Sequence, residues 1–144
     1  DKTMPRATLD SNGLKQVIIN LVKNAAEALE KGDEIQFKTR LVPGSAKVLI
    51  DEKRKLPGVV EITIKDNGPG IPSHIRERLF EPYNSTKTGA SNSGLGLSIV
   101  HAIVKEMQGN IACDSSRGKG TCFTIRIPLA RNTVPRASKE EAML

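Results

Sequence analysis

Three segments of the chain alternate apolar and polar residues, and this pattern constrains the fold more than any other feature of the sequence. They are residues 34–42, 59–66 and 119–128. Each predicts a half-buried β-strand, because successive side chains of a strand point to opposite faces. The apolar sides consist of Ile35, Phe37 and Leu41, of Val60, Ile62 and Ile64, and of Phe123, Ile125 and Ile127.

Residues 110–115 precede the third of these strands and predict a terminal hairpin with it, around residues 117–120. Cys113 and Thr121 share the inward parity of the hairpin, whereas Cys122 points outward. The two cysteines should therefore not face each other, which argues against a disulfide.

A helix is predicted over residues 11–31, where apolar residues recur at helical spacing. Asp10 or Ser11 can cap its start, and Gly32 ends it. The stripe consists of Leu14, Val17, Ile18, Leu21, Ala25 and Ala28. Asn20 and Asn24 lie one turn apart at the edge of this stripe, so they should border the core.

A second helix is predicted over residues 94–108, with a cap at Ser93 and a stop at Gly109. Its predicted apolar face consists of Leu95, Ile99, Ala102 and Ile103. A short helix opened by Ser73 is predicted over residues 72–80.

The composition argues against several classes of protein. A length of 144 residues suits one domain, which we place at residues 1–129. There is no signal segment and no apolar run long enough to span a membrane, so we expect a cytoplasmic location, leaving open whether the parent protein is membrane-anchored. The net charge is +6, but three Phe, one Tyr and no Trp give few rings for stacking bases, which disfavours nucleic acid. A small polyanion such as a nucleotide would profit from the same charge.

Asp66 has the same parity as the apolar residues of its strand, so its carboxylate should point to the apolar face. A bare charge is costly there. Two explanations are open: the aspartate caps the turn at Asn67 and Gly68, or it is an acceptor aimed into a pocket. Thr121 also lies inward, and its hydroxyl can assist Asp66 if the two strands are neighbours.

Residues 81–93 are polar, rich in Ser, Thr, Asn and Gly, and without hydrophobic period, which predicts a mobile loop. Gly94 and Gly96 follow in the first turn of the predicted helix. Free amides at a helix start suit phosphate, and simple close packing is the alternative reason for these glycines. Neither the Gly-x-x-x-x-Gly-Lys-Ser/Thr motif nor Gly-x-Gly-x-x-Gly between a strand and a helix occurs.

Two segments lack a clear pattern. Residues 43–58 mix a short apolar patch with dense charge, which indicates a hairpin extension or a surface insertion. Residues 130–144 have no periodicity, and we interpret them as a disordered tail or a linker.

The order of these features over residues 10–128 resembles the GHKL, or Bergerat-fold, ATPases. Asn20-x-x-x-Asn24-Ala25 is similar to their asparagine box, and residues 66–71 (Asp-Asn-Gly-Pro-Gly-Ile) are similar to their first glycine box. Residues 79–83 (Leu-Phe-Glu-Pro-Tyr) are similar to the phenylalanine box, and residues 93–100 and 118–121 to the second and last glycine boxes. The phenylalanine box and Gly-Leu-Gly-Leu-Ser-Ile-Val are typical of sensor histidine kinases within the superfamily.

The resemblance implies a role for each of several residues. Asp66 would accept a hydrogen bond from the adenine amino group, with Thr121 and Gly70 assisting through water. Asn24 would coordinate Mg²⁺, Asn20 would lie near the phosphates, and residues 81–93 would close over ATP as a lid. The complete set implied around Mg-ATP is Asn20, Asn24, Asp66, Gly68, Gly70, Ile71, Phe80, Lys87, Gly94, Leu95, Gly96, Leu97 and Thr121. For Lys87, a solvated loop lysine is the alternative to a phosphate contact.

The sequence departs from the family pattern in three places. Glu27 and Ala28 stand where many members carry a basic residue and an aromatic, which resembles the nitrogen-regulation branch and weakens the assignment of a phosphate-binding lysine on this helix. Only residues 4–9 are left to form the family's first strand. Neither His74 nor His101 is followed by Glu or Asp, so the phosphoacceptor histidine is expected on a separate dimerisation domain.

The resemblance implies a two-layer α/β (α+β) sandwich, with helices on one face of a mixed, largely antiparallel sheet. The polar face of this sheet would carry Lys38, Arg40, Glu61, Thr63, Lys65, Thr124 and Arg126. The expected function is that of the catalytic domain of a two-component sensor histidine kinase, which takes Mg-ATP and works with its dimerisation domain and a response regulator. A GHKL ATP hydrolase and a non-catalytic nucleotide-binding regulatory module are the alternatives. Hydrolysing relatives carry a glutamate four residues before the metal-binding asparagine, and here that position is Asn20.

Overall fold

Four strands form one sheet in the spatial order β1-β2-β4-β3. They are β1 (Ile35–Pro43), β2 (Gly58–Asp66), β3 (Asn110–Ser115) and β4 (Thr121–Pro128). The computed structural model describes residues 9–43, 58–82 and 94–129, and within these ranges every strand pairing is antiparallel. The predicted strands and hairpin are confirmed. The predictions for residues 4–8, 44–57 and 130–144 fall outside the described ranges.

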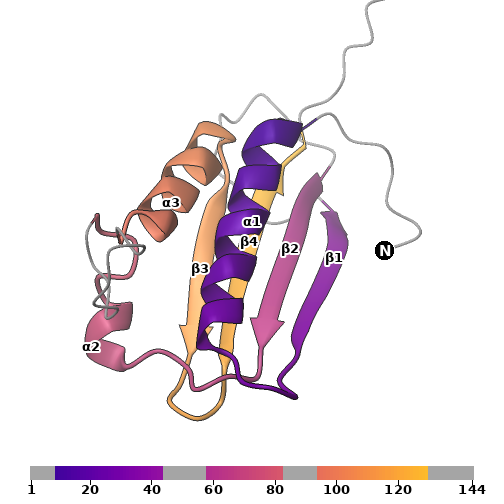
Figure 1. Cartoon of the computed structure of the whole chain (residues 1–144). Coiled ribbons are helices and arrows are strands. Elements are labelled where there is room, and N and C mark those ends of the chain that lie inside the picture. The colour runs from indigo at the N-terminus through magenta and orange to yellow at the C-terminus, as the bar shows by residue number, and fades with distance from the viewer. Residues whose placement is uncertain (1–8, 44–57, 83–93, 130–144) are drawn as a thin grey trace, which may run out of the picture.

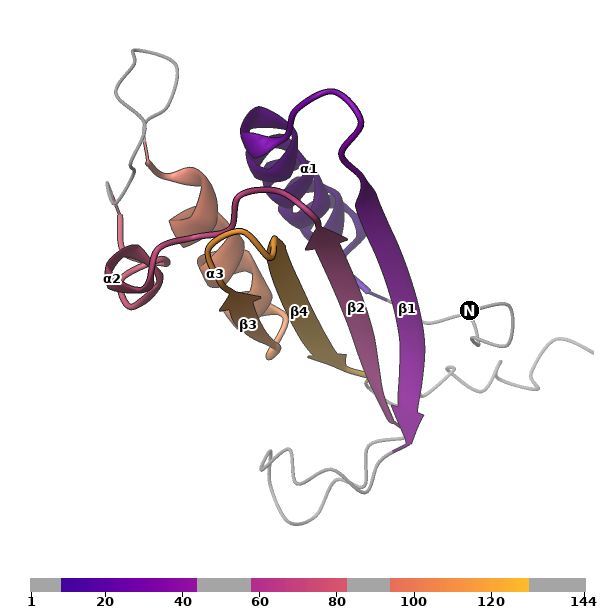
Figure 2. The ribbon, with the colours of Figure 1, turned by 90° about the horizontal axis from the view of Figure 1, so that it is seen from below.

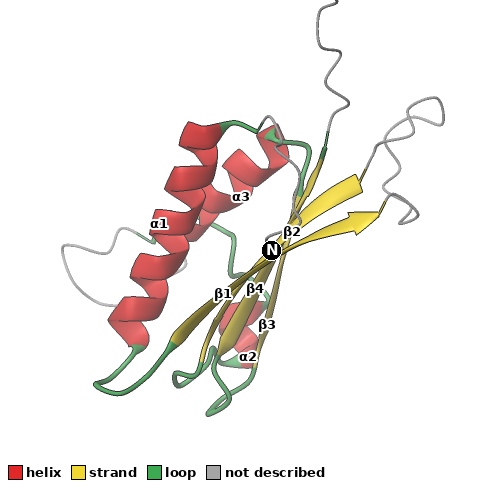
Figure 3. Ribbon diagram, turned by 90° about the vertical axis from the view of Figure 1, so that its right-hand side faces the viewer, coloured by secondary structure: helices red, strands yellow, loops and turns green. Residues whose placement is uncertain are grey.

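The helices are α1 (Ser11–Ala28), α2 (Ser73–Arg76) and α3 (Gly96–Glu106). Figures 1 and 2 show α1 and α3 lying on the same face of the sheet. Seen from the side, they make one layer and the strands make the other, and no described helix covers the opposite face (Figure 3). The expected two-layer α+β architecture is therefore confirmed.

Helix α1 begins where the sequence predicts, because the Asp10 side chain caps it by accepting a hydrogen bond from the amide of Asn12 at 3.1 Å. It ends at Ala28, ahead of the predicted end at residue 31, since Leu29 already has an extended backbone. A turn follows, in which the Asp33 carboxylate accepts from the amide of Glu30 at 2.9 Å.

The prediction of the buried face of helix α3 was partly wrong. The residues that it buries are Val100 and Val104, whereas Ile99 is 42% exposed and Ala102 is exposed. Apolar residues occur on almost every side of this helix, so periodicity alone does not choose the buried face. The helix begins at Gly96 after Leu95, and the proposed cap Ser93 lies outside the described ranges.

The core lies between the two layers. It combines Val17 and Leu21 of α1 and Val100 and Val104 of α3 with the inward residues of β2, β3 and β4. Phe37 has the expected parity but is 53% exposed, because β1 is the sheet edge among the described strands and lies beyond both helices (Figure 1).

The two cysteines are free, as predicted. Cys113 pairs in register with Phe123, and Cys122 pairs with Asp114, so their side chains lie on opposite faces of the hairpin. Burial raises the pKa of the Cys113 thiol to about 12, which keeps it protonated at neutral pH.

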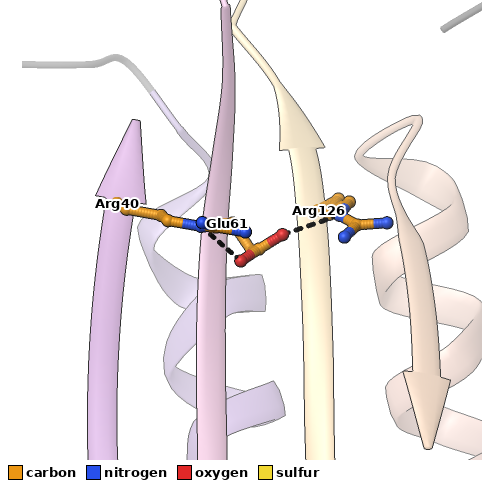
Figure 4. A network of polar contacts seen from close by, with 3 residues as sticks. All are labelled: Arg40, Glu61 and Arg126. Atoms are coloured by element: carbon orange, nitrogen blue, oxygen red, sulfur yellow. Dashed lines mark hydrogen bonds and ion pairs between the residues drawn. The ribbon is translucent and has the colours of Figure 1, made fainter. Parts of the chain in front are cut away.

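The other face of the sheet carries a row of three charged side chains, one from each of three adjacent strands (Figure 4). Glu61 lies between Arg40 and Arg126, whose Nε atoms donate to its two carboxylate oxygens at 2.6 and 2.8 Å. The Glu61 side chain is 6% exposed, and both arginine side chains are more than half exposed. This arrangement agrees with the predicted polar face.

Replacing Glu61 by Gln should lower the free energy of unfolding at neutral pH by about 1 kcal/mol, a modest figure because both guanidinium groups are well solvated. The hydrogen bond from Arg40 is the main cause that holds the pKa of Glu61 below its ordinary value, against the opposing effect of burial. Stability from such a carboxyl is present above its unfolded pKa and is lost as the pH falls through its lower folded pKa. The difference between the wild type and the variant should therefore shrink below pH ~4.

Urea unfolding at neutral and acid pH measures this effect. Glu81→Gln is the matched control, because it removes the carboxylate of an exposed pair with Arg78 and should have no measurable effect. Equal effects of the two substitutions would show that the row on the sheet contributes nothing to stability.

Candidate functional site

The inward side chains at one end of the sheet are polar. Asp66 ends β2, and Thr121 and Ser115 oppose each other at the start of β4 and the end of β3. The amide of Thr121 donates to Oδ1 of Asp66 at 3.1 Å, so the two strands are neighbours, as the predicted assistance required. All three residues are less than 9% exposed, which is rare for polar side chains that have no function or partner.

The two oxygens of the Asp66 carboxylate have different surroundings. Oδ1 accepts hydrogen bonds from the amides of Gly68 and Thr121, at 3.0 and 3.1 Å. Oδ2 has no hydrogen bond to any residue that the structure describes. The turn-capping explanation therefore accounts for Oδ1, and Oδ2 is left as an acceptor.

Glycines let the turn after β2 pack directly on the β3–β4 hairpin. A Cβ at Gly70 would lie 2.1 Å from the carbonyl oxygen of Ser116, and one at Gly120 would lie 2.0 Å from the carbonyl oxygen of Asp66. Both glycines have positive φ, 73° and 80°. The amide of Gly118 also donates to the Pro69 carbonyl at 2.7 Å. The first and last glycine motifs therefore form one unit.

Ser115 joins these two loops, and the sequence analysis missed it. Its hydroxyl oxygen accepts from the amide of Ile71 at 2.8 Å, donates to the carbonyl of Gly120 at 2.9 Å and lies 3.0 Å from Oγ1 of Thr121. Arg76, also missed, donates from Nη1 to the Ser115 carbonyl at 2.6 Å. The sequence feature that could have identified Ser115 is the inward parity that it shares with Cys113.

The two asparagines of α1 adjoin the start of α3. A Cβ built at Gly96 would lie 3.9 Å from Oδ1 of Asn20 and 3.9 Å from Oδ1 of Asn24. Among the described residues, Nδ2 of Asn20 is the only buried side-chain nitrogen or oxygen without a hydrogen-bond partner. Such an atom is costly unless something fills its donor capacity, so it suits an acceptor on a ligand.

Among the described residues, no side chain caps the start of α3. Gly94 has a φ of 66°, and Leu95 precedes the helix without forming a side-chain cap. The Ser98 hydroxyl donates to the carbonyl of Leu95 at 2.8 Å, so this contact does not occupy an amide of the first turn. The amides of Gly96 and Leu97, at the start of the helix, have the orientation that favours anions.

Phe80 contacts helix α3 and the core. Its ring stacks on His101 of α3, with 5.3 Å between ring centroids, and packs against the core. Lys87 and all of the predicted lid beyond Pro82 fall outside the described ranges.

The predicted site residues thus form two groups, one at the end of the sheet just past the end of α1 and one between α1 and the start of α3. One group combines Asp66, Gly68, Gly70, Ile71 and Thr121, and the other combines Asn20, Asn24, Gly94, Leu95, Gly96 and Leu97. Helix α1 links them, because Leu29 just past its end lies against Gly68. In the described ranges no three His, Cys, Asp or Glu side chains lie close enough to hold a metal ion, and no helix is long and apolar enough to cross a membrane.

This pairing of an aspartate and glycine loop with two helical asparagines matches a known family. The profile described as histidine kinase-, DNA gyrase B-, and HSP90-like ATPase covers residues 9–131. The chain belongs to this ATPase family.

Among curated members, the sensor kinase CckA of Brucella abortus is 40% identical over 121 residues, which is 83% of this chain and 13% of CckA. The sensory histidine kinase/phosphatase NtrB of Rhizobium leguminosarum bv. phaseoli is 37% identical over 144 residues, or 99% of this chain and 36% of NtrB. The chain therefore spans only a part of the length of these relatives.

Solved structures of family members have the same fold. Full-length ShkA in complex with AMPPNP superimposes with a TM-score of 0.71 at 26% identity, covering 88% of this chain and 24% of ShkA. The catalytic domain of histidine kinase ThkA gives a TM-score of 0.65 at 30% identity, covering 83% of this chain and 68% of that domain.

Proposed function

We propose that this chain is the ATP-binding catalytic domain of a sensor histidine kinase. In this role it supplies the γ-phosphoryl group of ATP to a histidine on a separate dimerisation domain, and a response regulator acts downstream. The observation that carries the proposal is the buried Nδ2 atom of Asn20, which has no hydrogen-bond partner among the described residues. Asn20 stands where a hydrolysing enzyme of this family would carry a glutamate.

The adenine ring would bind at the polar end of the sheet. Oδ2 of Asp66 is an acceptor that suits the amino group of adenine, and two amides hold the carboxylate in place through Oδ1. A base held in this way is recognised by hydrogen bonds rather than by charge, and such contacts provide specificity for one base.

The phosphates would lie between α1 and the start of α3. Nδ2 of Asn20 can donate to a phosphate oxygen, and so can the uncapped amides of Gly96 and Leu97. The side-chain oxygen of Asn24, beside Gly96, fits Mg²⁺, which binds through few protein ligands and otherwise through water and phosphate oxygens. When bound, Mg²⁺ would offset the negative charge of the phosphates. We assign the phosphate contact by Lys87 on resemblance alone.

The residues around the phosphates favour transfer over hydrolysis. An amide at position 20 has no useful basicity, so it cannot take the proton of an attacking water. An imidazole nitrogen is already nucleophilic and needs only to be positioned. A new bond forms between this nitrogen and the γ-phosphorus, the bond from the γ-phosphorus to the bridging oxygen breaks, and ADP leaves.

The isolated chain should bind ATP, hydrolyse it very slowly and fail to label itself. Steady-state release of inorganic phosphate measures the rate. Asn24→Ala is the variant for the metal contact and should weaken Mg-ATP binding, whereas Asp114→Asn, an exposed acid on the sheet's other face, should leave binding unchanged. Fast hydrolysis by the wild type that is abolished by Asn24→Ala would favour the hydrolase alternative. Nucleotide binding without any phosphoryl transfer to a dimerisation domain would favour the regulatory module.

We also propose a cytoplasmic location, since ATP is supplied there, and a domain end near residue 129. The family profile supports this boundary, because its match ends at residue 131.

A further inference from the structure

The Ser115 hydroxyl has more hydrogen-bond partners than it has protons. Its oxygen lies within hydrogen-bond distance of the Ile71 amide, the Gly120 carbonyl and the Thr121 hydroxyl, at 2.8, 2.9 and 3.0 Å. A serine hydroxyl has one proton and two lone pairs. The three contacts therefore use its full capacity, and each must have a fixed direction.

Only one assignment of protons satisfies all three contacts. The Ile71 amide can only donate, and the Gly120 carbonyl can only accept, so the single proton of Ser115 goes to Gly120. The remaining lone pair of Ser115 then accepts from Thr121. The reverse direction would set the lone pairs of Ser115 and of the Gly120 carbonyl against each other at 2.9 Å in a buried site, which is unfavourable.

This assignment uses up the proton of Thr121, whose hydroxyl can then only accept from any other partner. Its neighbour across the strands, Asp66, also offers an acceptor in Oδ2. We propose that Ser115 is a specificity-determining positioning residue, which fixes the Thr121 hydroxyl as an acceptor so that Thr121, like Oδ2 of Asp66, can only accept from the group at position 6 of a bound purine. The inference rests on the proposed nucleotide function. It implies selection of a 6-amino purine nucleotide, whose amino group donates at position 6, over a 6-oxo purine nucleotide, whose oxygen at that position can only accept.

Calorimetric titration of the whole chain with ATP and with ITP, each with Mg²⁺, tests this proposal. The wild type should bind ATP at least about 100-fold more tightly than ITP, because a site of unpaired acceptors rejects an acceptor. Ser115→Ala frees the Thr121 proton to donate to the 6-oxo group, so the ratio of the two affinities should fall about tenfold. A merely structural role for Ser115 would lower both affinities and leave their ratio unchanged.

A double-mutant comparison isolates the route through Thr121. In a Thr121→Val background the hydroxyl is absent, so adding Ser115→Ala should leave the ATP-to-ITP ratio unchanged. Ser98→Ala removes a hydroxyl that bonds the Leu95 carbonyl on the phosphate side, and it should not change the ratio either. If Ser115→Ala fails to fold, Ser115→Cys takes its place, since a thiol is a weak donor of similar shape and should lower the ratio in the same direction.

The outcomes separate this inference from the function on which it rests. A wild type that binds no ATP would overturn both. A wild type that prefers ATP, with a ratio that Ser115→Ala leaves intact or changes equally in the Thr121→Val background, would overturn the role of Ser115 alone.

Discussion

Gly120→Ala should lower the free energy of unfolding by about 3 kcal/mol or more, and it should also abolish nucleotide binding. An alanine Cβ at this position would lie 2.0 Å from the carbonyl oxygen of Asp66, and the neighbouring atoms are backbone, which cannot rotate away. The φ of 80° adds strain for any residue with a side chain. Relief of the clash requires β4 to move away from the end of β2, which separates Thr121 from Asp66.

Gly118→Ala is the matched control for this substitution. Gly118 has nearly the same φ, 75°, but nothing lies within 4 Å of a Cβ built there. Gly118→Ala should therefore lower the free energy of unfolding by about 1 kcal/mol, from backbone strain alone. Urea unfolding of both variants separates the two contributions. Equal losses would mean that the hairpin and the β2 turn do not pack as tightly as the structure indicates.

Asp66→Asn should weaken ATP binding by about 1–3 kcal/mol, or roughly 5- to 150-fold, and leave the fold intact. The asparagine oxygen can still accept from the amides of Gly68 and Thr121, so the turn keeps its hydrogen bonds. The Nδ2 group then replaces Oδ2 and presents a donor where the adenine amino group also donates. The substitution thus replaces one hydrogen-bond acceptor by a donor and leaves the volume of the side chain nearly unchanged.

Isothermal titration with a non-hydrolysable ATP analogue measures this loss, with thermal unfolding as the check on the fold. Unchanged affinity for ATP in a correctly folded Asp66→Asn protein would show that the adenine does not bind at this end of the sheet. Loss of folding together with affinity would instead make Asp66 a structural residue that caps its turn.

The features of the sequence that depend on local alternation predicted the structure well. The parity of Asp66 and Thr121 placed both side chains on the apolar face, and the strand pairing brings them into contact. Local parity works here because β4 buries mainly one face, and β2 does so at the end that carries Asp66. The asparagines of α1 were likewise placed at the border of the core by helical geometry alone.

Other features depend on which elements become neighbours, and the sequence could not supply them. The buried face of α3 is set by contact with α1 and the sheet, and its apolar residues offered several faces of similar character. Phe37 is exposed because β1 lies at the edge of the sheet among the described strands, not because of its own parity. The three contacts of Ser115 join residues from two loops that lie far apart in the sequence.

The most direct test of the central claim is to mix this chain with its cognate dimerisation domain and γ-labelled ATP, and to follow the label. The proposed function predicts that the label moves to the dimerisation domain as an acid-labile, base-stable phosphohistidine, and that Asn24→Ala prevents this transfer. Rapid release of the label as inorganic phosphate by the chain alone, with none on the dimerisation domain, would contradict it.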